Sequence, residues 1–264
     1  LIEKSNRKVV FTEAGDHIVK QAELVLNQLK ELEVAAQGLK DPMAGQLVIG
    51  AIPTIGPYLY PLILSAWKEK FPSVEYELHE LKTEEIVTQL QSGQIDLGVL
   101  ALPLNLSQLK EIPLYEEAFL LAVHAEQPIP QMVKPEWVEG QNLMLLTEGH
   151  CFRDQALEYC SINNSPVKSR FQATSLETLR SMVALGEGCT LVPELTAKQW
   201  SDNASVKEIR YVDFDTPTPV RQVGFLFRKG TRQQELFDAL GKVVSDQVAS
   251  CLRDRESKKL MRVQ

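Results

Sequence analysis

Cysteine is scarce in this sequence, with four residues among 264. They stand at positions 151, 160, 189 and 251, too few and too scattered for the disulfide framework of a small secreted protein. None of their spacings matches a zinc ribbon or a zinc finger. We therefore expect a cytoplasmic protein with no structural metal and no bound cofactor.

Long hydrophobic runs are also missing. The most apolar stretch, residues 58–67, is interrupted by Pro61 and is much shorter than the roughly 20 residues of a membrane-spanning helix. The N-terminus has no signal-peptide pattern. The sequence predicts a chain that neither spans nor enters a membrane. With 44% hydrophobic residues, it is long enough for two domains with buried cores.

An excess of positive charge is absent, because 28 Lys and Arg stand against 35 Asp and Glu, for a net charge of −7. Domains with a large nucleic-acid-binding face usually carry a basic excess, so we do not expect such a face here. Lys4, Arg7 and Lys8 nevertheless form a small basic cluster near the N-terminus. This cluster is either a solvated charge run or, since the chain begins at Leu1 without a Met, the remainder of a truncated domain.

A long helix with one apolar seam is expected over residues 15–40. Thr12 can cap its start, and Gly38 followed by Pro42 supplies a stop signal. The seam residues recur at alternating steps of four and three, as in a heptad repeat: Ile18, Ala22, Val25, Leu29, Leu32 and Ala36. A second copy of the chain is the simplest cover for this seam. The alternative is a helix that packs on its own domain.

The rest of the chain alternates short apolar strands with helices, which predicts an α/β fold. The expected strands are residues 45–52, 74–80, 95–101, 118–124, 142–146, 170–173, 189–193, 206–212 and 223–227. The expected helices are residues 57–70, 83–93 with Thr83 as cap, a segment beginning at Cys151, a segment with a capping box of Thr174 and Glu177 that ends at Gly186, and a C-terminal helix opened by Thr231 and Gln234. Two small α/β lobes fit this count.

The stretch GHCFRDQALEYC, residues 149–160, carries the most specific chemical signal. His150 and Arg153 can stabilise a thiolate at Cys151, and a helix that begins there would lower the thiol pKa further. A thiolate reacts with peroxide to give a sulfenic acid, which condenses with a second thiol to a disulfide. The spacing offers that second role to Cys160. The stretch predicts a peroxide switch, although two ordinary core cysteines remain the alternative.

The spacing of the two cysteines predicts a shape change. Residues 152–159 are good helix formers without Gly or Pro, so the reduced segment should be helical. Nine residues of helix rise about 13.5 Å and turn about 900°, which separates the two sulfurs. A disulfide needs Cα atoms only about 4.4 to 6.8 Å apart. The bond can form only if the helix refolds. We interpret Cys189 and Cys251 as packing residues.

Five segments, spread over essentially the whole chain, share a family resemblance. They are RKVVFTEAG, IPTIGPYLYP, HELKT, GHCFRDQALEYC and RFQATSLETLRSMVALGEG. Together they resemble LysR-type transcriptional regulators, and among these the peroxide-sensing members. The resemblance implies a two-lobed, periplasmic-binding-protein-like regulatory domain of type 2, with two strands that cross between the lobes. A linker helix and the end of a winged helix-turn-helix would precede it.

The resemblance also implies a division of the chain and a set of partners. Residues 1–14 would end the DNA-binding domain, and residues 15–40 would form the dimerisation helix. Lobe I would comprise residues 45–117 and 222–255, and lobe II, with the redox switch, residues 118–221. The implied partners are hydrogen peroxide, promoter DNA, RNA polymerase, further copies in a homotetramer and a glutathione or glutaredoxin-type reductant.

Residue by residue, the resemblance implies that Cys151 is the peroxidatic cysteine and Cys160 the resolving one. Thr54 and Thr83 match hydroxyl groups that orient peroxide and water near the sulfur. Such roles suit a hydroxyl group, because it both donates and accepts hydrogen bonds. Thr83 is also a good helix cap, which is the structural alternative.

Two cations complete the implied site. Arg221 matches an arginine that stabilises the thiolate, and His150 is the neighbour of Cys151 in the motif. A guanidinium is a fixed positive charge and therefore suits this role. As alternatives, Arg221 pairs with Asp215 and His150 is a structural donor.

Two other functions fit parts of the sequence. A thiol peroxidase also pairs a reactive and a resolving cysteine, but neither a CxxC motif nor a recognisable peroxidase loop is present. A metabolite-sensing regulator would bind a small anion between the same two lobes, for which Thr54 and Thr83 are equally suitable. The reaction with hydrogen peroxide distinguishes the three functions.

Overall fold

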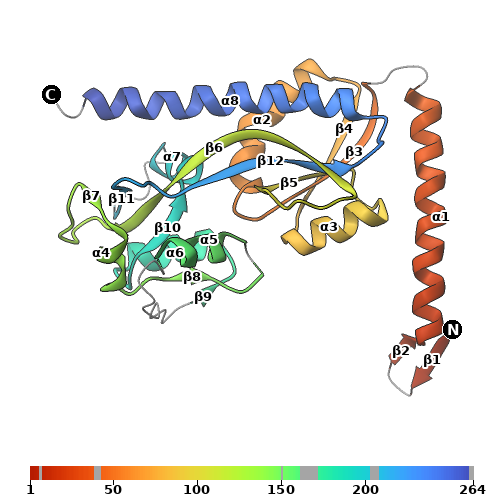
Figure 1. The fold of residues 1–264 in the computed structure, drawn as a ribbon, viewed down its shortest axis with the longest axis horizontal. Helices are drawn as coiled ribbons and strands as arrows, with labels where there is room; N and C mark the ends of the chain where they lie inside the picture. The colour runs from red at the N-terminus through yellow and green to blue at the C-terminus, as the bar shows by residue number, and fades with distance from the viewer. Residues whose placement is uncertain (6–7, 39–42, 150, 161–171, 203–207, 262–264) are drawn as a thin grey trace.

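The structure is a computed structural model, and it describes residues 1–5, 8–38, 43–149, 151–160, 172–202 and 208–261. Strands β1 (Ile2–Ser5) and β2 (Lys8–Phe11) form an antiparallel pair that precedes α1 (Glu13–Gly38). Helix α1 runs along one side of the molecule, with the two strands at its far end (Figure 1). The described part of its seam is open to solvent, because Ile18, Val25 and Leu29 are each more than half exposed. The seam is therefore available to another chain.

Lobe I is built on three parallel strands with helices between them. Its elements are β3 (Gly45–Ala51), α2 (Gly56–Lys70), β4 (Val74–Glu80), α3 (Thr83–Ser92) and β5 (Leu97–Leu102). β3 lies between β4 and β5, and both β3 and β5 are almost continuous runs of buried residues. Such runs are typical of strands covered on both faces. Helix α8 (Gln234–Met261) returns to this lobe, where Trp67 Nε1 donates to the Leu240 carbonyl oxygen at 3.3 Å.

Two long strands join the lobes. They are β6 (Leu109–His124) and β12 (Val220–Arg228). The first part of β6 pairs with β12, which in turn pairs with β5 of lobe I. From Phe119 onward, β6 pairs instead with β10 and β11 of lobe II. The two crossing strands implied by the family resemblance are thus present, and Figure 1 shows them passing between the lobes.

Lobe II contains the second half of the chain up to β12. Its further elements are β7 (Met132–Val133), α4 (Pro135–Glu139), β8 (Leu145–Leu146), α5 (Cys151–Cys160), β9 (Gln172–Ala173), α6 (Leu176–Ala184), β10 (Thr190–Pro193), α7 (Glu194–Asp202) and β11 (Ile209–Phe214). The fold is therefore the expected two-lobed α/β architecture.

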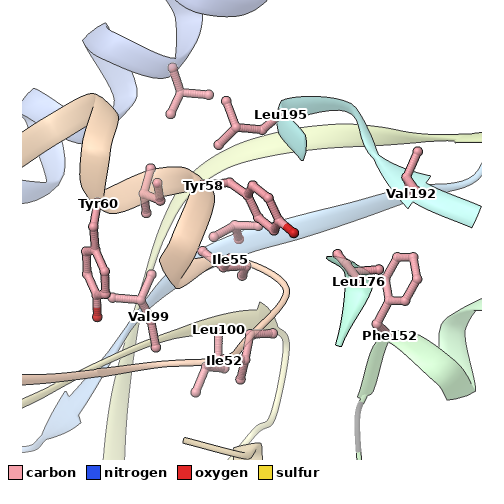
Figure 2. Packing of buried hydrophobic residues seen from close by; sticks show 14 of the residues in the cluster. Ile52, Ile55, Tyr58, Tyr60, Val99, Leu100, Phe152, Leu176, Val192 and Leu195 are labelled. Atoms are coloured by element: carbon pink, nitrogen blue, oxygen red, sulfur yellow. The ribbon is translucent and has the colours of Figure 1, made fainter. Parts of the chain in front are cut away.

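Apolar side chains from both lobes pack near the crossing strands (Figure 2). Ile52 and Ile55 belong to the segment between β3 and α2, whereas Phe152 and Leu176 belong to α5 and α6 of lobe II. All four are buried, with at most 3% of their surface exposed. The reactive segment expected from the sequence is therefore anchored in the common core.

Several expected boundaries are wrong in detail. Thr83 is the first residue of α3, whose cap is Lys82, and Ser175 rather than Thr174 caps α6, where its Oγ accepts from the Thr178 N–H at 3.2 Å. The strand expected at residues 118–124 begins at Leu109. Local sequence preference does not distinguish the adjacent hydroxyls of Thr174 and Ser175, the start of α3 differs from the expected one by a single residue, and the extension of β6 depends on a distant partner strand.

Candidate functional site

Helix α5 begins at Cys151 and ends at Cys160. Nine steps of 1.5 Å separate the two Cα atoms by about 13.5 Å. This is about twice the largest separation that a disulfide usually spans. The prediction of a helix between the two cysteines is confirmed. His150 and both cysteine side chains lie outside the described residues.

One face of α5 holds the helix in lobe II. Phe152 and Ala156 are buried one turn apart, and the Phe152 ring meets Phe119 edge to face with centroids 5.1 Å apart. Arg153, expected to stabilise the thiolate, donates from Nη1 to the Leu146 carbonyl oxygen at 3.1 Å. Its guanidinium thus tethers the helix to β8.

Arg221 lies at the centre of a buried network. It faces Glu117 across the β6–β12 pair, and its Nε and Nη2 donate to Glu117 Oε1 at 2.9 and 2.7 Å. Both residues are only 2% exposed. The other carboxylate oxygen of Glu117 accepts from the Leu195 N–H at 3.0 Å. Arg221 therefore pairs with Glu117 and not with Asp215, whose carboxylate accepts from the Thr216 N–H.

The same guanidinium positions Thr54 and contacts the first turn of α5. Nη1 donates to Thr54 Oγ1, and Nη2 donates to the Thr54 carbonyl oxygen, both at 3.0 Å. The Phe119 and Phe152 rings lie 5.9 and 5.7 Å from the guanidinium carbon, within the range of cation–π attraction. Arg221 thereby connects lobe I to the residue that follows Cys151.

These contacts determine how the Thr54 hydroxyl can act. Its oxygen accepts a hydrogen bond from Arg221, so its own hydrogen remains available to donate to a further group. Thr54 lies in the segment between β3 and α2, as expected, and is only 2% exposed.

A narrow pocket lies beside Thr54, and the side chains around it leave too little space for a water molecule. Its lining residues come from both lobes: Ile52, Pro53, Thr54, Lys82, Thr83, Gly149 and Phe152. The Thr83 hydroxyl is buried and has no hydrogen-bond partner within the described part of the chain. Since Lys82 is the cap of α3, the Thr83 hydroxyl does not cap that helix within the described residues. The pocket thus brings together Thr54, Thr83 and the first turn of α5.

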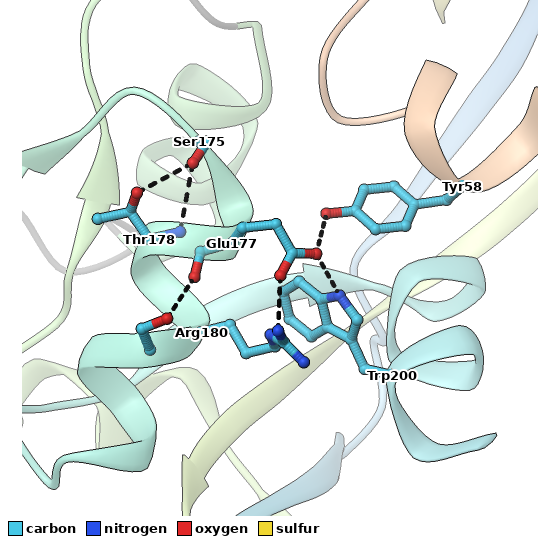
Figure 3. Close-up of polar contacts among 7 residues, drawn as sticks. Tyr58, Ser175, Glu177, Thr178, Arg180 and Trp200 are labelled. Atoms are coloured by element: carbon cyan, nitrogen blue, oxygen red, sulfur yellow. Dashed lines mark hydrogen bonds and ion pairs between the residues drawn. The ribbon is translucent and has the colours of Figure 1, made fainter. Parts of the chain in front are cut away.

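A second polar cluster connects the lobes away from this pocket (Figure 3). Glu177 Oε1 accepts from Trp200 Nε1 at 2.8 Å and from the Tyr58 hydroxyl at 3.4 Å, while Oε2 pairs with Arg180 at 2.9 Å. Burial, followed by the Glu177 carboxylate, raises the pKa of Tyr58 well above its ordinary value, so the phenol stays protonated and donates. This cluster joins α2 of lobe I to α6 and α7 of lobe II.

Other kinds of site find no support in the described ranges. No group of three His, Cys, Asp or Glu side chains converges there in a way that would hold a metal ion. None of the helices in those ranges combines the length and apolar character needed to cross a bilayer.

The comparisons with known proteins agree with this geometry. The LysR substrate binding domain matches residues 40–249. The chain belongs to the LysR family. Its relatives there are of the OxyR type: it is 38% identical over 254 residues to the hydrogen peroxide-inducible genes activator of Haemophilus influenzae, covering 96% of this chain and 83% of that protein. It is also 38% identical to the DNA-binding transcriptional dual regulator OxyR of Escherichia coli, covering 92% and 80%.

Solved structures of OxyR share the fold. A full-length OxyR variant from Pseudomonas aeruginosa superposes with a TM-score of 0.76 at 31% identity, covering 92% of this chain and 79% of that one. A hydrogen peroxide-bound OxyR variant from Corynebacterium glutamicum gives a TM-score of 0.77 at 29% identity, covering 98% and 82%. As a LysR-family chain of the OxyR type, this molecule therefore has close structural precedents for its two-lobed region.

Proposed function

We propose that this chain is the sensing part of a hydrogen peroxide-responsive transcriptional regulator. The carrying observation is that α5 begins and ends with cysteines, while its first turn lines a pocket with Thr54 and Thr83. The OxyR-type relatives support this function, because one of them is named as an activator of hydrogen peroxide-inducible genes. Cys151 is the peroxidatic residue and Cys160 the resolving residue.

The proposed reaction balances without a cofactor. The Cys151 thiolate attacks one peroxide oxygen, an S–O bond forms as the O–O bond breaks, and the other oxygen leaves as hydroxide, which takes a proton to become water. The Cys160 thiol then attacks the sulfenic sulfur, which forms the disulfide and releases a second water. Two thiols lose two electrons, and peroxide gains them.

The pocket supplies polar partners for the peroxide. Thr54 offers a hydrogen that Arg221 leaves free, and Thr83 offers a hydroxyl without a partner in the described residues. Arg221 acts on the thiolate mainly through position, because Glu117 already balances its charge. His150 adds a second cation when protonated. Together these groups orient the peroxide toward the first turn of α5.

The helix converts the reaction into a structural signal. Because about 13.5 Å separates the cysteine Cα atoms, α5 must refold before the disulfide closes. That refolding would change the surface that lobe II presents to neighbouring copies in a dimer or tetramer.

The structural change would pass through residues 15–40, the dimerisation helix, to residues 1–14, the end of a DNA-binding domain. In this way it would affect the binding of promoter DNA and RNA polymerase. Lobe I, as residues 45–117 and 222–255, would hold the pocket steady while lobe II, residues 118–221, refolds. A glutathione or glutaredoxin-type reductant in the cytoplasm would reset the switch.

The size of the pocket disfavours a metabolite sensor. Sites for small organic ligands usually have about 300–1,000 Å³, whereas the space between the side chains that line this pocket is too narrow to hold a water molecule. Hydrogen peroxide is much smaller than such ligands, and hydroxyl groups such as those of Thr54 and Thr83 are sufficient to bind it.

Intact-mass analysis after substoichiometric hydrogen peroxide tests the proposal. The wild type should lose two hydrogen atoms, with Cys151 and Cys160 joined in the mapped peptides. Cys160→Ser should gain oxygen at Cys151, whereas Cys151→Ser should not react. Cys189→Ser is the matched control, since Cys189 is a buried packing residue, and it should react like the wild type. Turnover with an added thiol donor would instead support a peroxidase, and no reaction at Cys151 would refute the proposal.

A further inference from the structure

Lys82 connects the two lobes at the edge of the pocket. It lies immediately before α3, and its backbone N–H donates to Glu85 Oε2 at 2.7 Å. Its side chain extends to lobe II, where Nζ donates to the Glu148 carbonyl oxygen at 3.3 Å. One end of the residue is thus fixed in lobe I, and the other end reaches the segment that leads to Cys151.

The stem of Lys82 also packs against Gly149. A Cβ added at Gly149 would lie 3.2 Å from Lys82 Nζ and 3.3 Å from Lys82 Cδ. Gly149 has a φ of +85°, a left-handed conformation that favours glycine. The lysine therefore covers the backbone two residues before Cys151. A larger residue at position 149 would disturb this contact.

The contact closes one side of the pocket. Lys82 and Gly149 both line it, and the adjacent Thr83 places its buried hydroxyl there without a partner in the described residues. Lys82 itself is exposed. It therefore stands between solvent and the polar group that would receive a peroxide.

We propose that Lys82 is a specificity-determining latch that admits hydrogen peroxide and hinders bulky organic hydroperoxides. This inference rests on the proposed function. While Lys82 is in place the pocket has no room for a water molecule, so a peroxide enters only as the Lys82 side chain gives way. Hydrogen peroxide, as the smallest peroxide, needs the least displacement. A hydroperoxide with an aromatic substituent has to displace the ammonium from that carbonyl and separate the Lys82 stem from Gly149. Removal of the side chain opens the pocket and lowers the discrimination.

The test compares two oxidants on the reduced full chain. Second-order rate constants of Cys151 oxidation are measured with hydrogen peroxide and with cumene hydroperoxide. The readout is the rate constant for hydrogen peroxide divided by the rate constant for cumene hydroperoxide. In Lys82→Ala the ratio should fall about tenfold, which corresponds to about 1.4 kcal/mol of lost discrimination. Lys82→Arg should keep the ratio close to that of the wild type. Lys68→Ala removes another exposed lysine of lobe I and should leave the ratio unchanged.

The outcomes separate the latch from the proposed function. An unchanged ratio in Lys82→Ala, with a wild type that reacts at Cys151, would overturn the latch alone. A wild type that reacts with neither oxidant would overturn the proposed function and the latch with it. A general loss of packing would slow both oxidants alike and leave the ratio constant, so that result also counts against the latch. Lys82→Met keeps the stem without the ammonium and should give an intermediate ratio.

Discussion

Two helices of ten residues, α3 and α5, flank the same pocket from opposite lobes, and they are secured very differently. In α3, the Lys82 N–H is bound by Glu85, and the αL cap residue Gly93 donates its N–H to the carbonyl oxygens of Gln89 and Leu90. Ile86 and Leu90 are completely buried. Arg228 Nη1 additionally donates to the carbonyl oxygen of Leu90 at 2.6 Å.

The described side chains of α5 bury less apolar surface than those of α3. Phe152 is the large buried residue, and Ala156 adds only a methyl group. Full burial of a large apolar side chain contributes about 1.5–3 kcal/mol, so the two completely buried side chains of α3 contribute about twice as much as Phe152 alone. Among the described side chains, the comparison teaches that the α3 wall of the pocket is held by capping bonds and two fully buried side chains, whereas the α5 wall depends mainly on Phe152.

Oxidation should give the largest difference between the two helices. If the disulfide forms by refolding α5, its amide hydrogens should exchange at rates close to those of an unfolded chain, because the helical hydrogen bonds are lost. The amides of α3 should keep their protection. Hydrogen exchange followed by mass spectrometry in the reduced and oxidised states measures both. Equal protection of α5 in the two states would show that the disulfide is structural.

Glu117→Ala should cause the next largest effect, a loss of about 4 kcal/mol in the free energy of unfolding. The substitution leaves the Arg221 guanidinium buried without its carboxylate and the Leu195 N–H without its acceptor. Urea unfolding measures the loss. Glu116→Ala is the matched control, because the neighbouring carboxylate is exposed, and it should change the free energy by less than about 0.5 kcal/mol. Similar losses in both variants would contradict the role of the buried pair.

Phe152→Ala should weaken α5 by about 3 kcal/mol and leave α3 unaffected. The ring supplies the large apolar contact of α5 and touches both Phe119 and Arg221. Hydrogen exchange of the reduced protein would show the loss as faster exchange confined to α5. Phe152→Leu retains most of the volume and should cost about 1 kcal/mol. Faster exchange in α3 as well would mean that the two walls are not independent.

Glu85→Ala should have the smallest effect, about 1 kcal/mol, on α3. It removes the bond to the Lys82 N–H at the start of the helix. Glu84→Ala removes a negative charge from the same turn without breaking that bond, so the difference in thermal unfolding between the two variants isolates the cap. If the two variants unfold at the same temperature, the stability of α3 comes from its buried residues and not from the cap.

Much of lobe I was predictable because its signals are local. The alternation in residues 74–80 gives β4 with its observed bounds, and the apolar run from Gly45 gives β3 to within one residue. The start of α5 at Cys151 was also predictable, since good helix formers follow it. These patterns need no knowledge of distant segments.

The missed features depend on distant segments. The first half of β6, LKEIPLYEE, contains charges and Pro113 and does not read as a strand, but it pairs along its length with β12. For the same reason Glu117 was missed as the partner of Arg221, because only the strand register brings residues 104 positions apart together. Lys82 gave no signal either, since its role depends on the approach of lobe II.

The buried pair of Glu117 and Arg221 also has an evolutionary consequence. A substitution that removes one charge leaves the other buried and uncompensated, so a single change is strongly disfavoured. A paired change to apolar residues of similar volume removes both charges and can be tolerated by the fold, but it removes the donors that hold Thr54. Lineages that keep the peroxide pocket should therefore keep both residues, whereas lineages that lose sensing should lose both together.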